Sequence, residues 1–115
     1  MSVATINSYS FGKIVINNHL YNQDVYIDTE GKVSPWQREE SHFIRLDDLE
    51  KITEENPEVL IIGTGAYGIA KVSPEINTFC QDKKIELIIK PTKEATEEYN
   101  RLKDKRTMAY FHLTC

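Results

Sequence analysis

The sequence has few cysteines, no long apolar run and no excess of basic residues, and each shortage excludes a class of protein. Only two of the 115 residues are cysteines, Cys80 and Cys115, and without C-x-x-C spacing they predict neither a disulfide scaffold nor a metal site. The longest aliphatic run, Val59 to Ile62, has four residues, whereas a membrane-spanning helix needs roughly 18–20. Fourteen basic against eighteen acidic side chains give a net charge of −4, which weighs against nucleic acid or an anionic membrane as a partner.

The amino terminus lacks the basic and apolar regions of a secretory signal, and it lacks the Arg-rich pattern of a mitochondrial presequence. We therefore expect a cytoplasmic protein in a reducing compartment, with Cys80 as a small buried side chain. What the sequence does contain is the balance of a folded globule, with 40% hydrophobic and 28% charged residues. We expect one domain over residues 1–115, long enough to bury roughly two-thirds of its unfolded surface.

The first third is predicted to be β structure. Lys13–Ile16, His19–Tyr21 and Asp24–Ile27 are short runs rich in β-branched and aromatic residues, and pairs of polar residues separate them. This pattern favours antiparallel strands joined by tight turns. The polar stretch from Ser34 to Ser41 is predicted to be an ordered loop.

A short helix is expected after this loop. Apolar residues recur at helical spacing between positions 46 and 52, and Asp47 is followed three residues later by Glu50, which is the pattern of a capping box. Pro57 disfavours the α conformation of the preceding residue, so we expect the helix to end at Asn56.

The second half is predicted to alternate strands and helices. The apolar run 59–62 is typical of a strand buried on both faces, and Ile85–Ile89 and Met108–Leu113 are the next two strands. Ser73 followed by proline starts one intervening helix, and Pro91 precedes the other. The order β-α-β-α-β predicts an α/β protein whose central sheet is mixed and mostly parallel, with these three strands as parallel neighbours.

A glycine-rich turn directly follows the first buried strand. Gly63-Thr64-Gly65-Ala66-Tyr67-Gly68 matches the G-x-G-x-x-G pattern whose backbone N–H groups approach a pyrophosphate. The helix signal comes only at Ser73, and the next strand ends in Lys90 rather than in an acidic residue that holds a ribose. We therefore expect no dinucleotide cofactor. Either the glycines shape a tight turn, with positive φ in at least one of them, or the turn accepts a small anion beside Lys90 at the C-terminal edge of the sheet.

A tryptophan, an arginine and a histidine lie in or just after the polar loop. Trp36 is interpreted as a hydrophobic lid on the core or as part of a binding site. Arg38 is of a type that stacks on aromatic rings or binds carboxylates, and His42 is of a type that serves as a general base. Since no nucleophile motif and no metal-ligand spacing accompany them, we assign no catalytic residue and no metal. His19 and His112, within strands, are interpreted as structural.

Several of these motifs together resemble a known family. In order they are Tyr9-x-Phe11-Gly12-x-Ile14, Trp36-x-Arg38 with His42, Val59 to Gly65, Val72-x-Pro74, and Phe111-His112-Leu113-Thr114-Cys115. The set is similar to the MTH-nine-three-eight-like domain family, and it covers essentially the whole chain. That family includes archaeal and bacterial hypothetical proteins, the animal adipogenesis-associated domain protein, and mitochondrial complex I assembly factor three. The last motif is most similar to the adipogenesis-associated branch.

The resemblance implies a three-layer domain in which a β layer and helices flank the central sheet. It implies no established catalytic activity, and it associates relatives with cell differentiation and respiratory-complex assembly. It also carries over six residues as a candidate ligand-binding site, namely Gly63, Thr64, Gly65, Trp36, Arg38 and His42. We add the remaining residues of the same turn and sheet edge, namely Tyr67, Gly68 and Lys90.

Two functions follow as alternatives. The first is a non-catalytic interaction or assembly module with a protein partner and no cofactor. The second is a small-ligand or anion-binding protein, or an unrecognised enzyme, that uses the glycine-rich turn. A concave polar pocket between Trp36, Arg38 and the turn would favour the second function. A turn occupied by the protein's own groups, with an apolar patch exposed elsewhere, would favour the first.

Overall fold

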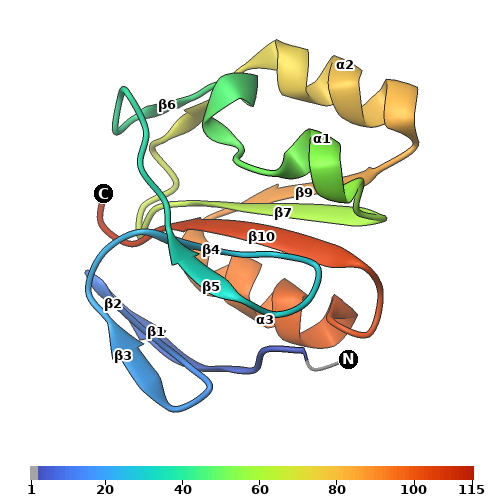
Figure 1. Ribbon diagram of the computed structural model, residues 1–115. Helices are drawn as coiled ribbons and strands as arrows, with labels where there is room; N and C mark the ends of the chain where they lie inside the picture. The colour runs from blue at the N-terminus through green and yellow to red at the C-terminus, as the bar shows by residue number, and fades with distance from the viewer. Residues whose placement is uncertain (1–2) are drawn as a thin grey trace.

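The computed structural model describes residues 3–115 and places a mixed five-stranded sheet at the centre of the molecule (Figure 1). The strands are β1 (Ile6–Ser10), β2 (Lys13–Ile16), β3 (His19–Tyr21), β4 (Val25–Ile27), β5 (Val33–Pro35), β6 (Phe43–Ile44), β7 (Val59–Thr64), β8 (Lys71–Val72), β9 (Glu86–Lys90) and β10 (Thr107–His112). The helices are the 3-10 helix η1 (Leu46–Asp48), α1 (Ile52–Glu55), α2 (Pro74–Lys83) and α3 (Thr92–Leu102).

The central sheet has the order β5-β4-β10-β7-β9. Its β10, β7 and β9 strands are parallel neighbours, whereas β4 is antiparallel to both β10 and β5. The predicted parallel arrangement of the three second-half strands is therefore confirmed. α2 lies between β7 and β9 in the chain and α3 between β9 and β10, which confirms the alternation of strands and helices.

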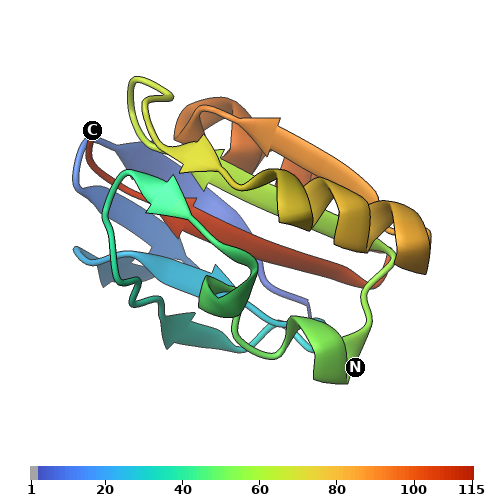
Figure 2. The ribbon, with the colours of Figure 1, turned by 90° about the horizontal axis from the view of Figure 1, so that it is seen from above.

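Two layers flank the sheet, and the three-layer α/β fold is confirmed. One face is covered by α3 and by the antiparallel sheet β1-β2-β3 (Figure 1). The other face is covered by η1, α1 and α2, with the two-stranded parallel pair β6–β8 beside them (Figure 2). No helix among residues 3–115 has the length and apolar composition needed to cross a bilayer.

The continuous apolar run in β7 is explained by burial on both faces. Leu60 and Ile62 pack in the core on the α2 side, and Val59 and Ile61 pack in the core on the α3 side. All six residues of β7 and all six of β10 are buried. Alternating side chains of the same strand therefore contribute to two separate cores, as expected for a strand inside a layered α/β fold.

The prediction for residues 46–56 was only partly right. A single helix does not form, because Lys51 takes a left-handed conformation with φ of 67° and separates η1 from α1. Asp48, rather than Asp47, accepts a hydrogen bond from the backbone N–H of Arg45 at 2.8 Å. Asn56 ends α1 as expected, with φ of 47°. The spacing of apolar residues predicts which side chains are buried, but it does not reveal that one residue inside the segment has a left-handed conformation.

Candidate functional site

The glycine-rich turn leaves the C-terminal end of β7 in a conformation that needs its glycines. Gly65 has φ of +106° and Gly68 has φ of +66°, so the predicted positive φ is confirmed. A β-carbon at Gly65 would lie 2.7 Å from the carbonyl oxygen of Thr114, and one at Gly63 would lie 2.9 Å from Oγ1 of Thr92. The glycines therefore allow other segments of the same protein to approach the turn closely.

The backbone donors of this turn are used inside the protein. The N–H of Gly65 donates to Oγ1 of Thr92 at 2.8 Å, and the N–H of Ala66 donates to the carbonyl of Thr114 at 2.7 Å. The N–H of Gly68 donates to the carbonyl of Gly65 at 3.2 Å. These three groups cannot cradle a phosphate without breaking internal hydrogen bonds, so the anion-cradling geometry considered from the sequence does not form here.

Trp36 belongs to the core on the α2 side. It is 3% exposed, and its Nε1–H donates to the backbone carbonyl of Asp48 at 2.8 Å. Its ring meets that of Tyr110 edge-on, with the ring centroids 5.3 Å apart. This is the geometry expected of a buried tryptophan whose single donor finds a partner, and it matches the interpretation as a hydrophobic lid.

Arg38 is directed into the protein and is neutralised there. Its side chain is 4% exposed, and Nη1 donates to Oδ2 of Asp24 at 2.8 Å. Nη2 donates to the carbonyl of Ser41 at 3.0 Å, and the guanidinium carbon lies 4.4 Å from the centroid of the Trp36 ring. Lys90 takes no part in these contacts, since its Nζ lies 3.4 Å from Oε2 of Glu98 on the surface.

Asp24 is the centre of a largely buried polar cluster, here called the Asp24 cluster, formed by Asp24, Arg38 and His112. Oδ2 of Asp24 lies 2.8 Å from Nδ1 of His112, and Oδ1 accepts the backbone N–H of Leu113 at 2.8 Å. A carboxylate only accepts hydrogen bonds, so we assign the proton of His112 to Nδ1. Although burial by itself raises the pKa of Asp24, hydrogen bonds from His112, Arg38 and Leu113 lower that pKa below its ordinary value.

The assigned tautomer makes Nε2 of His112 an acceptor. Within residues 3–115 this nitrogen and Nε of Arg38 are buried without a hydrogen-bond partner. The ring of His112 meets that of His42 edge-on at 6.2 Å, and Nε2 of His42 lies 3.8 Å from the sulfur of Cys115. His42, although exposed, therefore lies beside the buried cluster. Among residues 3–115 no group of three potential ligands is arranged to bind a metal ion.

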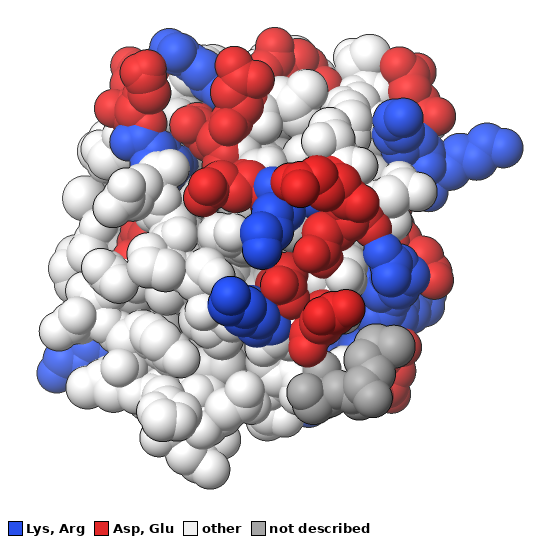
Figure 3. All heavy atoms as spheres, viewed as in Figure 1, with Lys and Arg blue, Asp and Glu red and all other residues white. Residues whose placement is uncertain are grey.

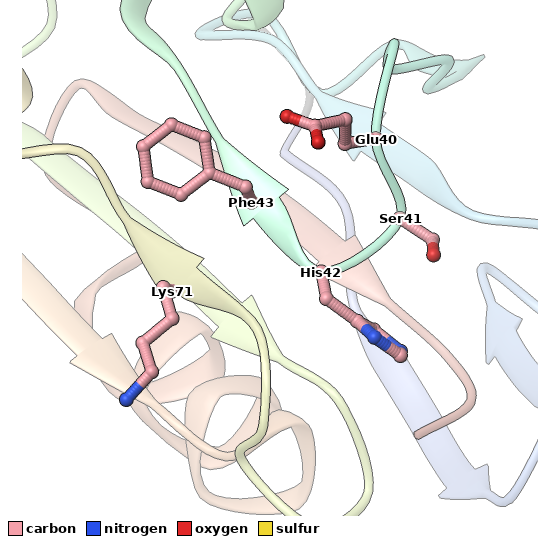
Figure 4. Close-up of a pocket in the computed structure, with 5 residues that line it drawn as sticks. All are labelled: Glu40, Ser41, His42, Phe43 and Lys71. Atoms are coloured by element: carbon pink, nitrogen blue, oxygen red, sulfur yellow. The ribbon is translucent and has the colours of Figure 1, made fainter.

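A shallow hollow of about 500 Å³ opens next to His42 (Figure 4). Figure 4 shows Phe43 and Lys71 on the neighbouring strands β6 and β8, with His42 directed away from Phe43. Glu40 lines the hollow and accepts a hydrogen bond from Arg45 at 2.8 Å. Of the nine residues proposed from the sequence, His42 alone lines this hollow.

Two candidates remain. Thr64 is buried and its Oγ1 donates to the carbonyl of Lys90 at 3.2 Å, whereas Tyr67 belongs to an exposed apolar surface. Tyr67 is 71% exposed, and its ring centroid lies 6.1 Å from that of Phe11, which is 54% exposed. Ile69, two residues further along the same turn, is 47% exposed. Phe11, Tyr67 and Ile69 are called the aromatic patch below. Exposed apolar clusters of this kind mark interaction sites more often than isolated surface residues do.

The neighbourhood of the aromatic patch is poor in charge. Residues 1–23 contain one charged side chain, Lys13, and residues 63–70 contain none, although 28% of the whole chain is charged. In Figure 3 the charged side chains gather over the upper and right-hand parts of the molecule, and the lower left, over β1 to β3, is mostly uncharged. Any partner of this surface must therefore be recognised mainly by apolar and neutral polar contacts.

Sequence reasoning missed Asp24, which organises the buried polar cluster, and it treated His112 as an ordinary strand residue. Asp24 and His112 are 88 positions apart. Asp24 belongs to none of the motifs, and the Phe111-to-Cys115 motif that contains His112 gives no indication that this histidine pairs with Asp24. The sequence does show a polar residue next to one apolar strand, Asp24, and another at the end of a second, His112. Such a pattern indicates that each needs a polar partner, but it does not indicate which residue the partner is.

A known family model and several solved structures match this chain over nearly its whole length. The family model described as "Protein of unknown function (DUF498/DUF598)" matches residues 6–112. A solved structure of conserved hypothetical protein PH1505 from Pyrococcus horikoshii is 33% identical, with a TM-score of 0.87 over 96% of this chain and 99% of that one. The structure of a protein described as MT938 is 26% identical, with a TM-score of 0.83 over 97% and 99% of the two chains. A Bordetella pertussis protein described as a Mth938-like domain shares the fold at 19% identity, with a TM-score of 0.65 over 95% and 85%.

Proposed function

The chain belongs to the DUF498/DUF598 family of unknown function and has the Mth938-like fold, and from that premise we propose that it is a non-catalytic protein-interaction module. The observation that carries the proposal is the contrast between the backbone donors of the glycine-rich turn and the aromatic patch, to which Tyr67 of the same turn belongs. The donors of the turn are satisfied internally, whereas the rings of Phe11 and Tyr67 are exposed side by side.

The proposed partner is a neutral, apolar segment of another protein. Charge supports this choice, because an acidic or basic partner would find only Lys13 to pair with along residues 1–23 and nothing along residues 63–70. Tyrosine and phenylalanine supply large contact areas with few rotatable bonds, and such residues are enriched where binding energy concentrates. The aromatic patch is thus suited to receive aliphatic or aromatic side chains.

Selection from a random peptide library on the intact protein tests the proposal. We expect enrichment of uncharged peptides with apolar anchors, whose Kd rises about tenfold or more with Tyr67→Ser or Phe11→Ser. Leu20→Ser is the matched control, because Leu20 is 60% exposed on β3 outside the patch. Failure to enrich any peptide, or equal affinity for the parent and the Tyr67→Ser variant, would contradict the proposal.

A second candidate function rests on the hollow beside His42. Lys71 lines it, and within the described residues no carboxylate forms an ion pair with Lys71. A small organic or inorganic anion is the ligand that such a hollow would accept, weakly and with strong salt dependence. Titration with phosphate, followed by amide chemical shifts, should move the signals of residues 41–43 and 71 in the parent and not in Lys71→Gln. The same titration of Lys13→Gln, which changes an exposed lysine elsewhere, should match the parent.

The cellular compartment is part of the same proposal. Both cysteines are free thiols, which supports a reducing environment, and we propose the cytoplasm. The Phe111-to-Cys115 motif supports a relationship to the adipogenesis-associated branch of the family.

A further inference from the structure

β9 is the outermost strand on one side of the central sheet, and its composition is unusual for an edge. It carries three consecutive apolar residues, of which Leu87 and Ile88 are half-buried and Ile89 is 40% exposed. The opposite edge, β5, is three residues long and ends in Pro35. Short length and proline are common protections of an edge strand against pairing with another chain. β9 has neither of them.

The backbone of β9 presents a defined set of groups to the outside. The N–H of Glu86 donates to the carbonyl of Glu58, and residues 86–90 run parallel to residues 59–63 of β7. Because successive residues of a strand point their N–H and C=O groups in opposite directions, those of Leu87 and Ile89 point away from β7. Among residues 3–115 no further strand lies on that side of β9.

We propose that β9 pairs antiparallel with β9 of a second copy of this chain, about a two-fold axis at Ile88. In this register Leu87 of each copy lies opposite Ile89 of the other. Both of these residues have outward N–H and C=O groups, so the two opposed pairs exchange four backbone hydrogen bonds. The two central sheets would then continue as one sheet across the interface, which is a common mode of strand addition.

The charges of β9 select the same register. Glu86 and Lys90 flank the apolar residues symmetrically about Ile88, so Glu86 of each copy lies opposite Lys90 of the other, where opposite charges attract. Shifting the axis by one residue in either direction places one of these two charged side chains opposite Ile88. Either shift therefore loses the attraction between Glu86 and Lys90 and sets a charged side chain opposite an apolar one.

The neighbouring registers also lose backbone hydrogen bonds. An axis at Leu87 places Ile89 opposite Ile85, whose N–H already donates to the carbonyl of Cys80 within the chain. An axis at Ile89 places Leu87 opposite Pro91, which has no N–H to donate. Hydrogen bonding and charge therefore agree on one arrangement, with the axis at the centre of the strand.

The faces of the strand agree as well. Glu86, Ile88 and Lys90 face the side of α3, where Lys90 lies 3.4 Å from Glu98 in the single chain. Leu87 and Ile89 face the side of α2, and Leu87 packs against the core there. Pairing would bring Ile89 against Leu87 of the second copy and remove its exposed surface from water. The partner is thus a second copy rather than an unrelated strand, because the sequence of β9 is complementary to itself.

This inference does not depend on the proposed function, because no residue of β9 belongs to the aromatic patch. Sedimentation equilibrium of the intact protein tests it. We expect concentration-dependent dimers, and slower hydrogen exchange at the amides of Leu87 and Ile89 as the protein concentration rises. Glu86→Lys should raise the dimer dissociation constant about tenfold or more. Glu86→Lys combined with Lys90→Glu should return that constant to within about threefold of the parent value.

Glu54→Lys is the matched control, because it makes the same change of charge at an exposed position on α1. Near-ultraviolet circular dichroism of each variant should match the parent, which separates loss of pairing from loss of folding. The proposal is overturned if the parent stays monomeric up to about 1 mM, the weak end of specific association. It is also overturned if Glu86→Lys dimerises like the parent, or if Tyr67→Ser disrupts the dimer and Glu86→Lys does not.

Discussion

The glycine-rich turn and the loop around Arg38 look alike as candidate binding elements, yet the protein holds them in place by different physics. The turn is held by neutral backbone hydrogen bonds, from Gly65 to Thr92 and from Ala66 to Thr114. The loop is held by an ion pair, in which the buried guanidinium of Arg38 faces Asp24. A neutral turn depends on space and backbone conformation, whereas an ion pair depends on both charges being present. The two elements should therefore fail under different perturbations.

The largest effect is expected when the ion pair loses its acid. Asp24→Ala would leave Arg38 and His112 buried without their common acceptor and would free the N–H of Leu113. We expect the free energy of unfolding to fall by about 3–5 kcal/mol, as for other broken buried pairs. Urea denaturation measures it, with Glu39→Ala as an exposed acidic control in the same loop. A loss below about 1 kcal/mol would mean that the loop is held mainly by packing of Trp36.

A smaller effect is expected in the turn, where only sterics and conformation change. Gly65→Ala must adopt φ of +106° and place a β-carbon 2.7 Å from a backbone oxygen, so we expect a loss of about 2–3 kcal/mol. Gly68→Ala is the matched control, because its φ is +66° and its nearest contact is a side-chain carbon of Pro91 at 3.2 Å. That substitution should cost about 1 kcal/mol. Equal thermal midpoints for the two variants would contradict the steric argument.

Lowering the pH should weaken the ion pair that holds the loop around Arg38 and should leave the contribution of the turn to stability unchanged. The pKa of Asp24 is lowered in the folded protein, so its carboxylate contributes stability above the unfolded pKa of about 3.9, and this contribution is lost as pH falls through the folded pKa. The difference in unfolding free energy between the parent and Asp24→Asn should therefore shrink below about pH 4. The difference between the parent and Gly65→Ala should stay constant over the same range. A constant difference for Asp24→Asn would refute the assignment of Asp24 as ionised.

The smallest perturbation is chemical labelling of the two thiols. Burial raises the pKa of Cys80 to about 11, and the residue is 2% exposed in the core on the α2 side. Cys115 is half-buried next to His42, close to the segment that closes the turn. A disulfide reagent at about pH 8 should therefore modify one thiol per chain quickly and the second only on unfolding. Fast reaction of both thiols in the folded protein would contradict the buried position of Cys80.

Sequence reasoning worked where structure is decided locally. The apolar run of β7, the Ser73-Pro74 start of α2 and the spacing of apolar residues in α3 are each patterns that can be seen within a few residues of sequence. It was incomplete at Lys51, because a left-handed residue in a helical pattern has no distinctive side chain. It also gave no indication of the parallel pairing between β6 and β8, since two-residue strands carry no periodicity.

The candidate site was predictable to a lesser extent. The motif predicted a positive φ in at least one of its glycines, whereas the groups that accept the N–H of Gly65 and of Ala66 belong to Thr92 and Thr114, far along the chain. The role of Arg38 could be stated only as a choice between an aromatic ring and a carboxylate, and the structure shows both contacts at once. Contacts between residues that are far apart in the chain leave no local pattern in the sequence, so only the folded structure reveals them.

The position of β10 has a consequence for how the protein forms during synthesis. β10 comes last among the described strands, yet it lies between β4 and β7 and joins the antiparallel part of the sheet to the parallel part. While the chain grows on a ribosome, β4 and β7 must remain without their shared neighbour until β10 has emerged. Their exposed edges are then open to wrong pairing, so expression at lower temperature or with a chaperone should increase the yield of folded protein. A nascent chain arrested before residue 107 should accordingly stay sensitive to protease, and one extended past residue 115 by a linker should become resistant.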